Sequence, residues 1–144
     1  MSENPREAAR EPARKAAKPP VRQDRRLRRN SVPLYVHGIV EYGVGALSIL
    51  APFLFSFDSD TARVVSILLG AGIVVLGFVT ESPTGVVRNL PIASHVVLDY
   101  VLSLVLLVAP FIFSFTDDAV ATGYFIAVGV GFILLTVATR YRTN

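Results

Sequence analysis

Four long apolar runs leave this chain few possible folds. They cover residues 34–55, 62–79, 94–113 and 120–139, and each is about long enough to cross a hydrocarbon core of about 30 Å as a helix. The runs are apolar on all sides, whereas a surface helix of a soluble protein keeps a polar face. They also lack the alternation of barrel strands. Since only helices and closed barrels satisfy their backbones in lipid, the sequence predicts an all-α membrane protein with four transmembrane helices.

The connections between the runs predict two tandem helical hairpins. Residues 57–61 and 115–119 form short acidic links, and helices joined by so few residues are antiparallel neighbours. A longer link over residues 81–93 joins the first hairpin to the second. We therefore expect a four-helix transmembrane domain over residues 31–144.

The two hairpins are copies of one unit. The phrase Ala-Pro-Phe-Leu-Phe-Ser-Phe at residues 51–57 returns 58 residues later as Ala-Pro-Phe-Ile-Phe-Ser-Phe. The same offset pairs Pro33/Pro91, His37/His95, Glu41/Asp99 and Tyr42/Tyr100, and a slip of one residue then pairs Gly70-x-Gly72 with Gly129-x-Gly131. This predicts a duplication with repeats over about 33–82 and 91–141. Because each unit holds two helices, both copies have the same orientation in the membrane.

A repeat of this kind resembles a known family. A tandem two-helix unit with a small–proline–aromatic triplet near the end of its first helix is similar to the SPW-repeat membrane proteins of prokaryotes. The triplets here are Ala51-Pro52-Phe53 and Ala109-Pro110-Phe111, whereas the family pattern reads Ser-Pro-Trp, so both copies depart at the first and third positions. The resemblance covers about residues 33–140. It implies a membrane architecture and no defined biochemical activity.

Residues 1–30 differ sharply from the rest of the chain. They carry ten of the fourteen Lys and Arg residues and no aromatic residue. Such a segment cannot bury enough apolar surface to offset its ordering entropy, so we expect a disordered basic tail. The cluster over residues 25–29 directly precedes the first apolar run, where basic residues set topology and attract anionic headgroups. Binding of nucleic acid is not expected, because base-stacking aromatic groups are missing from the tail.

The distribution of basic residues also predicts the topology. The tail, the 81–93 link and the C-terminal end hold 13 of the 14 Lys and Arg residues, while the acidic links have only Arg63 beside them. By the positive-inside rule, both termini are expected to be cytoplasmic, in a multi-pass protein of the plasma membrane.

Composition excludes several classes of chemistry. The chain has no cysteine and only two histidines, so disulfides, zinc–thiolate sites, iron–sulfur clusters and three-histidine metal sites cannot form within it. No set of nucleophile, base and orienting group is visible in the sequence. We therefore expect no enzymatic activity, no catalytic residue and no cofactor.

The candidate polar site consists of two His–acid pairs. His37/Glu41 and His95/Asp99 are each four residues apart, which places each pair on one helix face. Acids inside a membrane are costly and often functional. One hypothesis is a symmetric cluster between the first and third helices that binds a cation or passes protons. Two histidines and two carboxylates could also hold one divalent metal, although the sequence alone assigns no metal site. The alternative is a hydrogen-bonded pair that locks helix packing.

We expect the small residues and the prolines inside the apolar runs to have structural roles. Ladders of small residues spaced by four permit close helix contact in lipid. They predict a set of packing residues: Gly70, Gly72, Gly123, Ala127 and Gly131. Pro52 and Pro110 predict a kink or an early helix end. The phenylalanines beside and after them are expected at the membrane interface.

These observations predict an integral membrane protein without enzymatic activity. We expect a structural, interaction or accessory subunit that associates with itself, with lipid or with another membrane protein. The alternative is a small transporter or a proton or cation conductor that uses the His37/Glu41 and His95/Asp99 pairs. A conductor needs a polar path, but the central depth of the runs offers only Ser48, Ser66 and Ser103.

Overall fold

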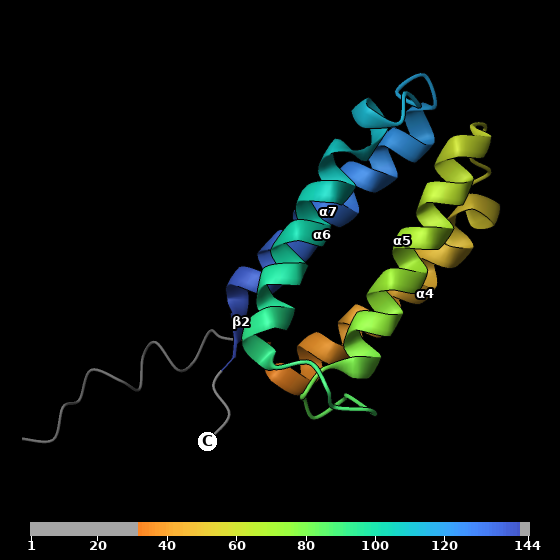
Figure 1. Cartoon of the computed structure of the whole chain (residues 1–144). Coiled ribbons are helices and arrows are strands. Elements are labelled where there is room, and N and C mark those ends of the chain that lie inside the picture. The colour runs from red at the N-terminus through yellow and green to blue at the C-terminus, as the bar shows by residue number, and fades with distance from the viewer. Residues whose placement is uncertain (1–31, 142–144) are drawn as a thin grey trace, which may run out of the picture. The chain divides into compact units, whose positions relative to one another are not determined.

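The backbone is almost entirely helical over residues 32–141, the part of the chain that the computed structural model describes (Figure 1). The elements in order are β1 (Val32–Pro33), α4 (Leu34–Leu54), α5 (Asp60–Val79), α6 (Ile92–Ile112), α7 (Ala119–Ala138) and β2 (Thr139–Arg140). All four helices have 20 or 21 residues and are long and apolar enough to cross a membrane. The predicted fold class is therefore confirmed. The tail predicted over residues 1–30 lies outside the described residues.

The helices pack as two antiparallel hairpins, α4 with α5 and α6 with α7 (Figure 1). Each acidic turn is built in the same way. The N–H of Phe57 donates to the Pro52 carbonyl at 3.1 Å, and the N–H of Phe115 donates to the Pro110 carbonyl at 3.0 Å. The intervening Ser56 and Ser114 are left-handed, with φ of 53° and 54°. The duplication seen in the sequence thus extends to the backbone conformation of the turns.

Each intrahelical proline lies two residues before the end of its helix, which agrees with the predicted early termination. Proline has no N–H, so Pro52 leaves the Ser48 carbonyl without its helical donor. The Ser66 hydroxyl of α5 donates to that carbonyl at 2.6 Å. A polar group released by the helix end therefore joins the two helices of the first hairpin.

The phenylalanines near these turns divide into two groups. Phe53, Phe55, Phe111 and Phe113 are exposed on the apolar surface, as expected for interfacial anchors. Phe57 and Phe115 are instead buried, and Phe57 packs against Tyr124 of α7 at a ring-centroid distance of 5.6 Å. The left-handed serine before each of these rings turns the chain back toward the helices.

The Asp118 carboxylate connects the two turns. One oxygen accepts from the N–H of Ala121 at 2.9 Å and so caps α7. The other accepts from the N–H groups of Asp58 and Ser59 at 2.8 and 3.0 Å, which belong to the turn of the first hairpin. Burial opposes the charge of Asp118, but these backbone donors outweigh it and hold the pKa of the carboxyl below its usual range.

The opposite end of the domain is closed by two equivalent backbone pairings. β1 and β2 pair in parallel, with Val32 opposite Thr139, and an isolated parallel bridge joins Thr80 to Leu90. In each case the residue after the second helix of one repeat pairs with the segment before the first helix of the other repeat. The two repeats therefore close on each other reciprocally, as a pseudo-twofold arrangement requires.

Glycines bring the helices of each hairpin into close contact, but not every residue predicted to pack takes part. A Cβ at Gly70 would lie 2.7 Å from the Gly45 carbonyl oxygen, and one at Gly129 would lie 2.8 Å from the Leu107 side chain. Gly72, Gly123 and Gly131 have nothing within 4 Å of such an atom, and Ala127 is exposed. The prediction of close packing is thus right for Gly70. The other four residues do not pack against a helix within residues 32–141, so close packing there stays a prediction for contacts outside this chain.

Candidate functional site

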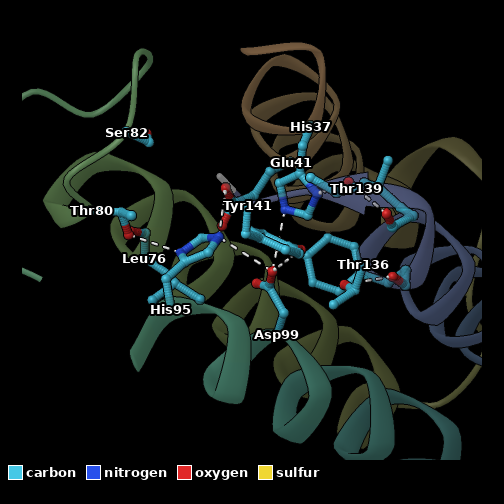
Figure 2. A network of polar contacts seen from close by, with 12 residues as sticks. His37, Glu41, Leu76, Thr80, Ser82, His95, Asp99, Thr136, Thr139 and Tyr141 are labelled. Carbon is cyan, nitrogen blue, oxygen red and sulfur yellow. Dashed lines mark hydrogen bonds and ion pairs between the residues drawn. The ribbon is translucent and has the colours of Figure 1, made fainter. Parts of the chain in front are cut away.

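The four residues of the predicted polar pairs meet in one buried cluster between the hairpins (Figure 2). His37 and Glu41 come from α4, and His95 and Asp99 come from α6. Asp99 Oδ2 lies 3.2 Å from Nε2 of His37 and 3.2 Å from Nε2 of His95. His95 Nε2 also lies 3.7 Å from Glu41 Oε2. Each histidine therefore contacts the acid of the other repeat, and only His95 also keeps the contact predicted within its own helix.

Two threonines fix the orientation of the imidazoles. Thr139 Oγ1 lies 2.9 Å from His37 Nδ1, and Thr80 Oγ1 lies 2.8 Å from His95 Nδ1. Each threonine hydroxyl donates its proton to the carbonyl four residues earlier, of Leu135 or Leu76, at 2.6 Å. Since a hydroxyl has one proton, its oxygen must accept from the imidazole. Both histidines therefore carry N–H at Nδ1, and both Nε2 atoms face the carboxylates.

Thr80 and Thr139 were not singled out in the sequence, although a signal for them exists. They are 59 residues apart, which is the offset that relates the second helices of the repeats. Each immediately follows its helix and contacts the histidine of the other hairpin. Extension of the alignment of the second helices, at the offset of 59, to position 80 would have paired them.

Tyr141 completes the cluster on the side of His37. Its hydroxyl donates to Asp99 Oδ2 at 3.3 Å, and its ring packs edge-on against the His37 ring at a centroid distance of 5.6 Å. Burial, together with the nearby Asp99 carboxylate, raises the pKa of the Tyr141 phenol above its ordinary range, so the phenol remains a donor. The repeat does not point to Tyr141, because the equivalent position in the first repeat, 59 residues earlier, is Ser82.

Glu41 reaches the cluster because a glycine leaves room for it. A Cβ at Gly77 of α5 would lie 3.1 Å from Glu41 Oε2. The carboxylate can therefore lie against the backbone of α5 while it faces His95. A side chain at position 77 would displace it.

The contacts of Thr80, His95 and Asp99 have the order of a catalytic triad, but they lack its chemistry. The Thr80 hydroxyl donates to a backbone carbonyl and accepts from the imidazole, so the imidazole does not act as its base. Thr80 is also only 1% exposed. The arrangement is suited to hold groups in place or to bind a small cation.

The comparisons agree with the repeat architecture. The model of the SPW repeat domain matches residues 35–140, which is most of the chain. The chain belongs to the SPW repeat family. With its four apolar helices, this SPW repeat protein is a multi-pass integral membrane protein. No curated protein and no solved structure matched it. All four cluster residues lie within the matched range, and Tyr141 lies one residue beyond it.

Proposed function

We propose that this SPW repeat protein is a non-enzymatic subunit that acts by lateral association in the membrane. The observation that carries the proposal is the outward-facing ladder of Gly123, Ala127 and Gly131 on α7. Glycine is a poor helix former, and these two glycines have no close-packed neighbour in the described part of the chain. In lipid, small residues four apart allow another helix to approach closely.

The favoured partner for this surface is a second copy of the chain. A ladder of small residues is self-complementary, because two such helices can cross with their ladders in contact. The buried polar groups support a role without catalysis, since the threonine hydroxyls of the cluster donate to backbone carbonyls.

Replacement of the central rung tests the association. We expect Ala127→Leu to abolish a dimer that native mass spectrometry detects for the wild-type protein released from membranes. Val97→Leu on α6, which is also exposed, should leave the dimer intact. A wild-type protein that is monomeric in lipid, or a dimer unaffected by Ala127→Leu, would contradict the proposal. If native mass spectrometry instead shows the wild type bound to a different membrane protein, and Ala127→Leu no longer binds it, that protein is the partner in place of a second copy.

A second candidate function is a small transporter or a proton or cation conductor. The buried cluster of His37, Glu41, His95 and Asp99 favours it, because such groups line ion pathways in membranes. Toward the acidic turns, however, the polar contacts between the hairpins are sparse within residues 32–141: Ser48 with Tyr124, and then Asp118 with the backbone of Asp58 and Ser59. Such sparse contacts weigh against a continuous polar path. Ion flux into liposomes that disappears in Glu41→Gln would support conduction.

We also propose that the protein lies in the plasma membrane with both termini in the cytoplasm. The excess of Lys and Arg on the side of the termini and of the 81–93 link supports this orientation. The basic tail would then face the anionic headgroups of the inner leaflet.

The absence of cysteine makes the orientation easy to measure. Asp117→Cys and Arg88→Cys each introduce one exposed thiol into the cysteine-free chain. A membrane-impermeant maleimide applied to intact cells is expected to label position 117 and not position 88. Labelling of position 88 from outside would reverse the proposed topology.

A further inference from the structure

The buried cluster contains contacts that neutral imidazoles do not explain. Both imidazoles carry their N–H at Nδ1, so in the neutral form each Nε2 presents a lone pair. Each of these lone pairs faces Asp99 Oδ2 at 3.2 Å. A lone pair and a carboxylate oxygen repel each other unless a positive charge lies between them.

Several polar atoms of the cluster also lack partners. His37 Nε2, Glu41 Oε1 and Asp99 Oδ1 are buried and have no hydrogen-bond partner among residues 32–141. Unpaired buried polar atoms are rare and destabilising. They belong to three residues that are each at most 1% exposed. One of these atoms, His37 Nε2, also belongs to the close contacts with Asp99.

Three distances in the cluster are close to those between the ligands of a metal ion. A tetrahedral ion with bonds of about 2.0–2.1 Å separates its ligand atoms by about 3.4 Å. The three close contacts between nitrogen and oxygen in the cluster are 3.2, 3.2 and 3.7 Å. One ligand atom from each of His37, Glu41 and His95 also lies within 4.8 Å of the others. Asp99 is not one of these three residues, but its Oδ2 atom lies 3.2 Å from Nε2 of both histidines, so it is the candidate for a fourth ligand.

The surroundings fit the same interpretation. Histidines that bind metals usually donate their other N–H to a neighbouring acceptor, which fixes the ring and the tautomer. Thr80 and Thr139 are such acceptors. Two carboxylates with two neutral imidazoles carry a charge of −2. Within the described part of the chain, no Lys or Arg side chain forms an ion pair with Glu41 or Asp99. A divalent cation would make the buried cluster neutral.

We propose that His37, Glu41, His95 and Asp99 form a binding site for one divalent transition-metal ion of the Zn²⁺ class. Two imidazole nitrogens and two carboxylate oxygens suit such ions better than Mg²⁺ or Ca²⁺, which prefer oxygen ligands alone. The protein supplies all four ligands, as in structural rather than catalytic zinc sites. Since α4 and α6 each give two ligands, the ion clamps one repeat to the other. The proposal is independent of association through α7.

Metal content and a cobalt spectrum test the site directly. The full chain is purified in detergent, stripped with EDTA and titrated with Co²⁺ and then Zn²⁺. We expect one ion per chain by elemental analysis, visible Co²⁺ bands of tetrahedral intensity, and loss of these bands when Zn²⁺ is added. Mg²⁺ should not displace Co²⁺. A helical, monodisperse wild-type protein that binds no Co²⁺ or Zn²⁺ would overturn the proposal and leave the cluster to protons alone.

Two matched variants separate ligation from packing. Thr80→Val keeps the side-chain shape but removes the acceptor of His95 Nδ1, and it should weaken Zn²⁺ binding by about 10–100-fold. Thr122→Val is the control, because Thr122 lies near the acidic turn at the other end of α7, where its hydroxyl donates to the Phe115 carbonyl at 3.3 Å. Glu41→Gln should lose Zn²⁺ while circular dichroism stays helical. Equal Zn²⁺ affinity of the wild type and a folded Glu41→Gln variant would refute the assignment of the ligands.

Discussion

Asp99→Ala is expected to lower the free energy of unfolding by about 3–5 kcal/mol, the usual cost of removing one partner from a buried charged network. The Asp99 side chain is fully buried, and its Oδ2 atom contacts His37, His95 and the Tyr141 hydroxyl at once. The variant leaves these three groups without their common partner and opens a cavity between the hairpins. Equilibrium unfolding of the full chain in mixed micelles, with EDTA present throughout, measures the change.

The control for Asp99→Ala is another aspartate that has no buried contacts. Asp117 is exposed in the turn of the second hairpin, and Asp117→Ala should change the free energy of unfolding by less than about 0.5 kcal/mol. Equal effects of the two substitutions would mean that the cluster contributes nothing to the contact between the hairpins. Because EDTA removes divalent ions, this result does not depend on the proposed metal site.

The helices and their duplication follow from the sequence because both leave long, repeated patterns. A run of about twenty apolar residues determines a helix in lipid almost regardless of tertiary contacts. The observed helix bounds differ from the predicted ones by at most two residues. The differences at α5 and α7 arise from the caps, since Ser59 and Asp118 bind the first free N–H groups and start the helices earlier.

The cluster was found in the sequence, but its connections were not. Spacing by four places His37 and Glu41 on one face, yet it does not tell which face turns toward the other repeat. Both polar faces turn toward the pseudo-twofold axis, so His37 contacts Asp99 and His95 contacts Glu41. The single-residue slip between the offsets of the first and second helices hides the threonines that hold each imidazole.

The glycines show the same limit of sequence patterns. Gly70-x-Gly72 and Gly129-x-Gly131 are equivalent in the two repeats, and in both the first glycine packs while the second points outward. Residues two apart lie on nearly opposite sides of a helix, so only one of each pair can face the neighbouring helix. A ladder of small residues predicts a close contact but not whether the contact lies inside the chain or outside it.

This difference between Gly70 and Gly72, two residues apart on α5, gives the second large effect. Gly70→Ala should lower the free energy of unfolding by about 1–3 kcal/mol or more, because the new methyl group overpacks the contact between α4 and α5. It would meet the Gly45 carbonyl oxygen at 2.7 Å and the Ile49 nitrogen at 2.9 Å. These are backbone atoms, so rotation of a side chain cannot relieve the clash. The two helices must separate.

Gly72→Ala provides a control two residues away on the same helix. Position 72 has nothing within 4 Å of a Cβ, so the substitution adds only the better helix propensity of alanine. We expect Gly72→Ala to leave the free energy of unfolding unchanged or to raise it by up to about 1 kcal/mol in the same micelle titration. If the two alanines have the same effect, α4 and α5 do not touch at Gly70. If Gly72→Ala alone lowers the free energy of unfolding, the outer face of α5 packs against another molecule, and that contact contributes to stability.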